Sequence, residues 1–594
     1  MKNRFNEILL RAKHLLLRFP MILTMALLAS VGAILMSENP NWKYQNFAYS
    51  KFTIVCCLGI SVMFALKMIS QRIGKEILLQ ILGVVFLIGF LLFLPEKQEY
   101  FTENYVYLIV SIFILSHLLV AFGAFLRSRK EIGFWQYNKN LFVNLFLTIV
   151  FTGVLTAGVE LAILAVDKLF DLNINSRIYQ ETFYFLLIFG SCFIFLLFNE
   201  SGLQHLEKDG NYPLILKFFT QFILIPLLLI YLLILYFYCI KIIINWELPR
   251  GWVSYLVLAY SVVGILALLL VHPLKADSAK SWVKGFSKIF YYTLLPLLVL
   301  LYVAIFTRIL QYGFTEPRYF VLLIAIWLTS VVLYFIFSKK SDIRFIPVSL
   351  FAFGLIALIL PYYNAFSVAK RSQKKELLQT LEKNHLLRNR KIDFDQKLDY
   401  KTAIDIRDKF EFLTQRKEFD FLLNLMDAPK QKELKKEFAM MNYWKAGNLV
   451  KGYFPNIINN QNINNYLELY SLQTVIPVKD YQYIANLRKL SPAFQNNYET
   501  KEMILQKDKI IITDKMYQEN PMFLVALNSG EQKNLMPEII HFFENYKNQT
   551  GRHEMQEISI VTQLGKYSIK FYFDSISKNG ELYYYNDALV LVKE

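Results

Sequence analysis

The chain has 594 residues, of which 55% are hydrophobic and 16% aromatic, and its formal net charge is +17. This composition excludes an ordinary soluble protein of that length, and the long apolar runs indicate an integral membrane protein. A basic balance can indicate nucleic-acid binding, but +12 of the +17 precedes Pro361, among the apolar runs. Short cytoplasmic loops and anionic lipid account for charge placed there, so we expect the lipid bilayer and no nucleic acid as a partner.

The first 19 residues read MKNRFNEILLRAKHLLLRF, a basic and amphipathic lead-in that we expect in the cytoplasm. The apolar run that follows has no small-residue cleavage site, so we interpret it as a retained first span. All four cysteines lie inside apolar runs, which leaves the polar C-terminal region without a disulfide framework or a cysteine zinc site. They are Cys56, Cys57, Cys192 and Cys239.

A transmembrane helical domain is predicted over residues 20–366, because its apolar runs approach the roughly 20 residues that a span needs. About eleven runs qualify: 20–36, 52–69, 77–94, 105–125, 141–165, 182–199, 218–244, 252–271, 289–307, 319–337 and 345–363.

The loop charges predict the orientation of these spans. With a cytoplasmic N-terminus, the inside segments hold 21 Lys and Arg residues and the outside segments hold 9. This bias follows the positive-inside rule and, with an odd number of spans, places the C-terminal domain outside the cytoplasm. The basic segment AKRSQKK at 369–375, directly after the last span, favours the opposite side.

A soluble α+β domain is predicted to follow the spans. Residues 367–470 carry helical periodicity in segments 369–385, 401–426 and 430–446, and Asn-rich 456–465 is expected to be a loop. Residues 471–594 are strand-rich, with strands expected at TVIPV, KIIIT and FLVAL. The alternating residues after 557 predict a closing β-meander, with a tight hairpin turn at Asn579-Gly580.

Two polar interruptions share the residues Glu, Pro and Arg: NWELPRGW at 245–252 and FTEPRY at 314–319. Aligning Pro226 with Pro296 brings the two loops into near register, so hairpins 218–271 and 289–337 are a possible parallel repeat about the membrane normal. Chance similarity between Leu-rich spans is the alternative.

Residues that favour helix ends explain most of the sequence of these two loops. Thr315 can cap the next helix, Pro317 can occupy its first turn, and a carboxylate is favoured near a helix N-terminus. The arginines remain to be explained, because the charge rule disfavours them on the outer side. We expect them to pair with the two glutamates in a polar rim at the outer interface. The rim candidates are Glu247, Arg250, Arg308, Glu316 and Arg318.

Three polar residues within the spans are further candidates: His117, Glu160 and Gln221. A proton or ion path through His117 and Glu160 is one reading, and single interhelical hydrogen bonds are the other. No phosphate loop, dinucleotide fingerprint or zinc-protease motif occurs. Glu538, His541 and His553 form no complete metal set, so we assign no catalytic residue, no metal site and no cofactor.

Three motifs resemble a bacterial multi-pass family catalogued as domain of unknown function 4153. They are WELPRGWVS at 246–254, YGFTEPRY at 312–319 and AFSVAKRSQ at 365–373. The resemblance covers most of the chain and implies an integral membrane protein of unassigned activity, with no catalytic or ligand residue to carry over.

The favoured function is a non-enzymatic scaffold or sensor in a bacterial cytoplasmic membrane, whose outer domain meets an envelope protein. One alternative is a transporter built on paired, proline-kinked hairpins. The other is a membrane enzyme that acts on a lipid-linked substrate at the outer rim.

Overall fold

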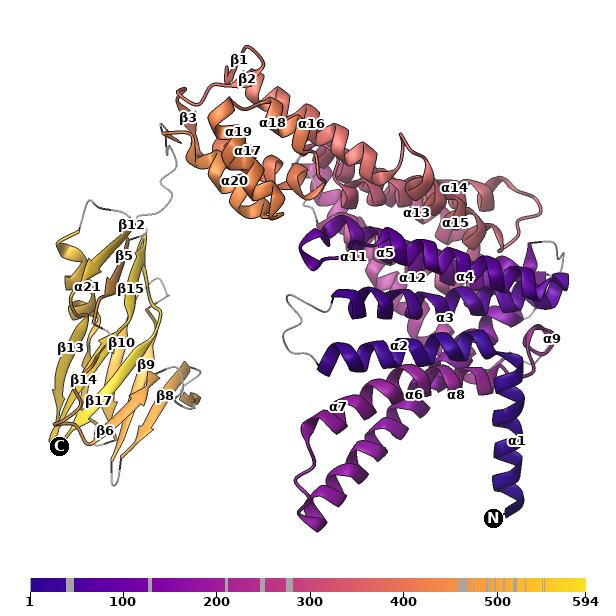
Figure 1. The fold of residues 1–594 in the computed structure, drawn as a ribbon, viewed down its shortest axis with the longest axis horizontal. Coiled ribbons are helices and arrows are strands. Elements are labelled where there is room, and N and C mark those ends of the chain that lie inside the picture. The colour runs from indigo at the N-terminus through magenta and orange to yellow at the C-terminus, as the bar shows by residue number, and fades with distance from the viewer. Residues whose placement is uncertain are drawn as a thin grey trace. The chain divides into compact units, whose positions relative to one another are not determined.

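The computed structural model divides into two compact units, each described by itself (Figure 1). Unit 1 contains residues 1–396 and 402–455, and unit 2 contains residues 397–401 and 456–594. The division by compactness thus falls after Pro455, whereas the boundaries expected at 366 and 470 mark changes of composition. The structure describes all residues except 1, 39–46, 127–130, 209–211, 246–251, 274–280, 456, 459–466, 474, 488–489, 491, 496–497, 506–507, 517–520, 529, 547–548 and 550.

Membrane helices make up most of unit 1. Within the described ranges, ten helical segments are long and apolar enough to cross a membrane, and α15 is a shorter apolar helix. These confirm the prediction of a polytopic α-helical membrane protein. The elements are α2 (Pro20–Glu38), α3 (Phe47–Ile73), α4 (Glu76–Phe93), α5 (Glu103–Phe122), α6 (Glu131–Phe170), α7 (Ser176–Phe185), η3 (Leu186–Gly190), α8 (Ser191–Phe198), α10 (Leu214–Phe218), η4 (Phe219–Leu224), α11 (Ile225–Asn245), α12 (Trp252–Leu270), α13 (Ser281–Tyr312), α14 (Glu316–Phe337) and α15 (Phe345–Ile359).

Further helical elements lie before and between these spans. Helix α1 precedes Pro20, the first residue of α2, and runs across the direction of α2 in Figure 1. The basic side chain of Arg18 donates to the Ser201 carbonyl, 3.1 Å away, which fixes the end of α1 against the segment after α8. The short elements are α1 (Lys2–Arg18), η1 (Gln98–Tyr100), η2 (Gly123–Phe125) and α9 (Leu203–Leu206).

Two apolar cores hold the membrane helices together. The first joins buried residues between Leu15 and Leu206 and also takes in Ile343. The second joins buried residues between Leu224 and Ile346. The membrane region is therefore built as two halves in sequence order, with the chain around Ile343 reaching back from the second half into the first.

The two prolines that suggested a repeated hairpin lie in different local structures. Pro226 follows a π-helical turn, η4, near the start of α11. Pro296 lies inside α13, which continues as an α-helix on both sides of it. A proline has no amide hydrogen to donate. Membrane helices tolerate this loss when local adjustments satisfy the carbonyl that is left without its donor. The repeat stays a prediction.

A helical cap completes unit 1. We use this name for the helices of residues 365–455, which follow the last apolar helix. Helix α16 begins at an Asn364 cap, whose side chain accepts from the Ser367 amide. Lys417, at φ 58°, separates α17 from α18. The cap contains α16 (Ala365–Lys383), β1 (Leu387–Arg388), β2 (Lys391–Ile392), α17 (Tyr400–Gln415), α18 (Phe419–Asn424), α19 (Ala428–Ala439) and α20 (Tyr443–Gly452).

Strands dominate unit 2, which confirms the predicted strand-rich domain. Its sheets have the orders β11-β10-β9-β8-β7, β12-β5-β15-β16 and β13-β14-β17-β6, with a short β3-β4 pair, and they share one apolar core. The elements are β3 (Leu398–Asp399), β4 (Ile457–Ile458), β5 (Leu467–Ser471), β6 (Tyr483–Asn486), β7 (Pro492–Gln495), β8 (Tyr498–Ile504), β9 (Lys509–Asp514), β10 (Phe523–Leu527), β11 (Gln532–Asn534), α21 (Met536–Glu544), β12 (Gly551–Met555), β13 (Ser559–Leu564), β14 (Tyr567–Phe573), β15 (Ser575–Asn579), β16 (Leu582–Tyr585) and β17 (Ala588–Lys593).

The C-terminal strands pair antiparallel in the order β13-β14-β17. The hairpin β15-β16 comes between β14 and β17 in sequence but belongs to another sheet, so these strands are not the simple meander of consecutive neighbours that was expected. Asn579 pairs with Leu582, so the hairpin turn is Gly580-Glu581, with Gly580 at φ 64°. Residues 475–478 form no strand, contrary to expectation, because Pro477 has no amide to donate. Most of the predicted loop 456–465 lies outside the described residues.

Candidate functional site

A buried ion pair joins the membrane helices to the cap. Glu316, the first residue of α14, accepts from Arg416, the residue after α17: Nε lies 2.8 Å from Oε1, and Nη2 lies 2.6 Å from Oε2. The two side chains are 0% and 2% exposed. Such a two-pronged pair fixes distance and orientation together. Residues 100 apart in sequence are thereby locked into one position.

Arg416 makes further contacts with Phe412. Arg416 Nη1 donates to the Phe412 carbonyl at 2.9 Å, and its guanidinium lies 3.2 Å from the centre of the Phe412 ring. Each carboxylate oxygen of Glu316 accepts one hydrogen bond from Arg416. The pair therefore holds the start of α14 against the end of α17.

The turn before Glu316 is held by α16. Ser372 Oγ accepts from the Phe314 amide at 2.8 Å, while Gln373 Nε2 donates to the carbonyls of Tyr312 and Phe314 at 2.9 and 3.0 Å. Between them Gly313 has φ 70°, and a Cβ there would lie 2.7 Å from Glu376 Cγ. Two of the motifs noted in the sequence, YGFTEPRY and AFSVAKRSQ, thus meet at one junction. We call these contacts, with the Glu316–Arg416 pair, the cap junction.

The arginines expected at the rim have other contacts. Arg318 donates to the carbonyls of Tyr312 and Gly313, at 3.0 and 2.8 Å, and Arg308 lies over the Tyr312 ring. Glu316 pairs instead with Arg416, a residue of the polar region after the spans. Glu247 and Arg250 lie outside the described residues.

The expected capping role of Thr315 is only partly observed. Thr315 occupies the position before α14 and Pro317 lies in its first turn, but among the described contacts the Thr315 side chain makes no capping hydrogen bond. The sequence does not indicate Arg416 as the partner of Glu316, because its context, LTQRKEF, is that of an ordinary exposed helix end. The one signal in the sequence for a basic partner is the charge of Glu316 at the end of a span.

A polar pocket adjoins the cap junction. Its volume is about 370 Å³, and its basic groups are already engaged: Arg416 with Glu316, and Lys370 with Glu418 at 2.9 Å. Lys417 lies over the Tyr100 ring. No acidic residue is among the described residues that line it. The lining includes Thr102, Asn104, Asn364, Ser367, Gln415 and Lys417.

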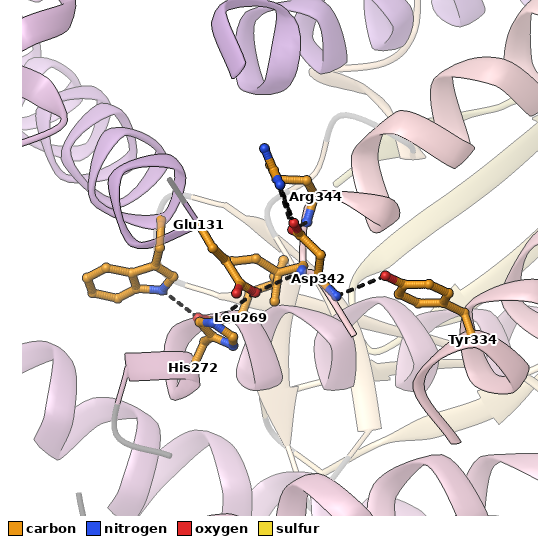
Figure 2. Close-up of polar contacts among 8 residues, drawn as sticks. Glu131, Leu269, His272, Tyr334, Asp342 and Arg344 are labelled. Carbon is orange, nitrogen blue, oxygen red and sulfur yellow. Dashed lines mark hydrogen bonds and ion pairs between the residues drawn. The ribbon is translucent and has the colours of Figure 1, made fainter. Parts of the chain in front are cut away.

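A second polar network lies at the far end of α14 and joins the two halves of the membrane region (Figure 2). Glu131 Oε1, at the start of α6, lies 3.2 Å from His272 Nε2, just beyond α12, and accepts from the Ile343 amide at 3.1 Å. Nearby, Trp135 Nε1 donates to the Leu269 carbonyl at 2.6 Å. One carboxylate therefore bridges two loops of the second half. We call this the seam network.

Asp342 and Arg344 extend the seam network, as Figure 2 shows. Asp342 pairs with the Arg344 guanidinium, and its amide donates to Tyr334 Oη at 3.0 Å. Burial acts to raise the pKa of Asp342, but hydrogen bonds from Arg344 and its positive charge outweigh burial, so the pKa lies below its usual value. The carboxylate thus stays ionised and keeps the turn before α15 in place.

The intramembrane candidates divide between two places. His117 of α5 and Glu160 of α6 both line one cavity of about 870 Å³, so the structure brings them to the same site. His117 Nδ1 lies 2.8 Å from the Phe113 carbonyl, a bond within its own helix. Gln221 lies in the π-helical turn η4 and is not part of that cavity.

Metal-binding groups are not assembled in the described part of the chain: no cluster of three or more His, Cys, Asp or Glu side chains could hold an ion. His541 contacts Glu544 and Glu538 contacts Lys533, so these side chains have ordinary surface partners.

Comparison with known proteins identifies a family to which no activity is assigned. The model of a family described as "Domain of unknown function (DUF4153)" matches residues 23–395, most of the membrane-spanning region. The chain belongs to this family. It is also similar to "Uncharacterized protein PM1469" of Pasteurella multocida (strain Pm70), with 32% identity over 244 residues. That match covers 40% of this chain and 41% of the relative. No solved structure matches the chain.

The family match ends at residue 395, so it includes Glu316, Ser372 and Gln373 but not Arg416. The cap junction therefore links the matched region to the segment that follows it.

Proposed function

We propose that this DUF4153 protein is a non-enzymatic membrane scaffold or sensor that holds a helical cap rigidly against its spans and displays a strand-rich domain. The observation that carries this proposal is the Glu316–Arg416 pair, which is buried and bidentate between membrane helix and cap. Breaking such a pair leaves an uncompensated buried charge, so the cap is held in a single position.

The loop charges support a cytoplasmic N-terminus in the bacterial inner membrane, with the cap and the C-terminal domain outside. The cap end of the helices carries the turn at Gly313 and the pair at Glu316, whereas basic Lys339 and Lys340 follow α14 at its far end. In this arrangement the strand-rich domain is available to an envelope protein partner.

Sidedness is tested with single cysteines in an otherwise cysteine-free protein, labelled in intact cells with an impermeant maleimide. Exposed reporters are Lys435→Cys in the cap, Glu581→Cys in the strand-rich domain and Lys340→Cys at the far end. We expect labelling of the first two and protection of Lys340→Cys until the cells are lysed. The reverse pattern overturns the extracytoplasmic placement.

The scaffold is distinguished from a rim enzyme by replacing the pair as a unit. The double variant Glu316→Leu with Arg416→Met removes both charges at similar volume, so a structural pair is replaced without an orphaned ion. Rescue of a deletion strain by this variant at normal abundance supports the scaffold. Loss of rescue at normal abundance supports a rim enzyme. A transporter instead requires the two proposed hairpins to superpose by rotation about the membrane normal.

A further inference from the structure

One cavity of unit 1 lies among the membrane helices, not at the cap. It has a volume of about 870 Å³ and is lined by residues of α2, α3, α5, α6, α7, η3 and α8. Sites for small organic molecules typically measure about 300–1,000 Å³, so one molecule of that class fits. Most lining side chains are apolar. Phe142, Ile149 and Leu187 also expose 51, 64 and 46% of their surface, so the cavity opens toward the hydrocarbon.

One wall of the cavity carries a polar stripe. Thr148, Thr152, Thr156 and Glu160 recur at intervals of four on α6, which places them on one helix face. Thr148 Oγ1 donates to the Asn144 carbonyl at 2.7 Å. Thr152 and Thr156 are only 3% and 7% exposed, and within the described structure their hydroxyls have no hydrogen-bond partner. One carboxylate oxygen of Glu160 is likewise unpartnered there.

Unpartnered buried hydroxyls are costly, and more so in hydrocarbon, where no water can replace the missing partner. A serine or threonine in a membrane helix usually donates back to the carbonyl four residues earlier, as Thr148 does. Two successive hydroxyls that do not, on the wall of an open cavity, indicate a ligand that supplies the missing acceptors or donors.

The dimensions of the cavity fit a molecule of the bilayer. It extends along α6 from Asn138 to Glu160, a rise of roughly 33 Å at 1.5 Å per residue. That length matches the hydrocarbon thickness of roughly 30 Å. An ion path would need polar groups around its circumference, whereas here the stripe lies on α6 and the facing walls are largely apolar. The cavity therefore has one polar wall and several apolar walls, an arrangement that suits an amphiphilic ligand.

We propose that this cavity binds one amphiphilic lipid from the bilayer. Its hydrocarbon chain lies against the apolar walls, and its ester or head-group oxygens accept hydrogen bonds from Thr152 and Thr156. Neither the scaffold role nor the sidedness of the cap is required for this binding.

Two glycines of α6 provide a matched pair of variants. Gly153 lines the cavity, whereas Gly158 does not, and a Cβ at either position would meet nothing within 4 Å. Gly153→Trp therefore introduces a large side chain from a position that lines the cavity. Gly158→Trp makes the same change on the same helix, away from the cavity.

The test uses the full chain in nanodiscs of phosphatidylethanolamine and phosphatidylglycerol, with a phosphatidylethanolamine probe that carries a diazirine in its acyl chain. After irradiation, cross-linked peptides are mapped by mass spectrometry. We expect labelling concentrated on cavity-lining segments 141–157 and 187–195, reduced about tenfold by Gly153→Trp and unchanged by Gly158→Trp. Equal labelling in both variants, or even labelling over all lipid-facing helices, overturns the proposal.

A second pair of variants tests the hydroxyls without filling the cavity. Thr152→Val with Thr156→Val keeps the shape and removes both donors, and Thr152→Ser with Thr156→Ser keeps the donors. We expect the valine pair to lower labelling by the phosphatidylethanolamine probe several-fold, the serine pair to retain it, and a diazirine-bearing alkane to label both equally. If the valine pair retains full phospholipid labelling, the assigned role of the hydroxyls is wrong.

Discussion

The two ends of α14 are held by polar contacts of different kinds. At its start, the Glu316 and Arg416 side chains are 0% and 2% exposed, and Arg416 also donates to the Phe412 carbonyl. At its far end, the Glu131 and His272 side chains are 32% and 20% exposed, and Glu131 also accepts from the Ile343 amide. The first contact joins a span to the cap, and the second joins the two halves of the membrane region.

This comparison shows that the role of a charged contact depends on how deeply it is buried and on how far apart in sequence the joined residues lie. A fully buried pair penalises the loss of one partner heavily, since the other charge stays in an apolar site. A half-buried network loses less, because water reaches the group left behind. The cap junction is therefore expected to open as a unit, and the seam network to loosen gradually.

The largest expected effect is at Arg416. Arg416→Met leaves Glu316 buried without its partner and should destabilise the docked cap by about 3–5 kcal/mol. Rates of proteolysis of the cap in detergent-solubilised protein, converted to a free energy of opening, measure this. The control is Arg407→Met on α17, whose partners Asp408 and Glu411 are 55% and 21% exposed, so that about 1 kcal/mol is expected. Equal effects at the two arginines would show that the buried pair does not hold the cap.

The next effect concerns the seam network. Glu131→Gln keeps an acceptor for the Ile343 amide but removes the charge facing His272, and should cost about 1.5–3 kcal/mol. Thermal unfolding in detergent measures the change. Glu181→Gln, which removes an exposed i,i+4 pair with Arg177, should cost about 0.5 kcal/mol or less. A loss at Glu131 no larger than at Glu181 would contradict the bridging role.

Gly313→Ala tests the turn of the cap junction. The φ of 70° disfavours a Cβ, and the new atom would meet Glu376 and Ser372, so we expect a loss of about 1–2 kcal/mol in cap docking. Gly285→Ala is the control: it lies inside α13 with open space around it and should stabilise by up to about 1 kcal/mol. Proteolysis of the cap should respond to the first change alone.

The smallest effect is a pH dependence within the cap. Glu418 pairs with Lys370 and Lys374; burial acts to raise its pKa, but the hydrogen bonds and charges of the lysines lower it below the usual 4.5. Its contribution is therefore fully present above about pH 4.5 and is lost as the pH falls through the lowered value. Glu418→Gln should cost about 1 kcal/mol or less at pH 7 and flatten the acid limb of cap stability. An unchanged acid limb would assign that limb to other carboxylates.

Amino-acid order alone determined the membrane character of residues 20–366, because runs of about 20 apolar residues can bury their backbone in hydrocarbon only as helices. It also indicated the helical character of the cap and the strands β9, β10 and β13 to β17, because periods of 3.6 and 2 are local properties. No local sequence pattern marks the division after Pro455, because the compactness of a unit depends on contacts between segments that are distant in sequence.

Only the tertiary structure decided the partner of Glu316, because a helix end at residue 416 reads as exposed until the cap folds over α14. The tertiary structure likewise brought His117 and Glu160, which are 43 positions apart in sequence, to the lining of one cavity. Thr152 and Thr156 line the same cavity. Periodicity shows which face of a helix a residue occupies. What that face meets depends on the packing of helices that are far apart in the chain, and this packing alone creates the junction, the seam and the cavity.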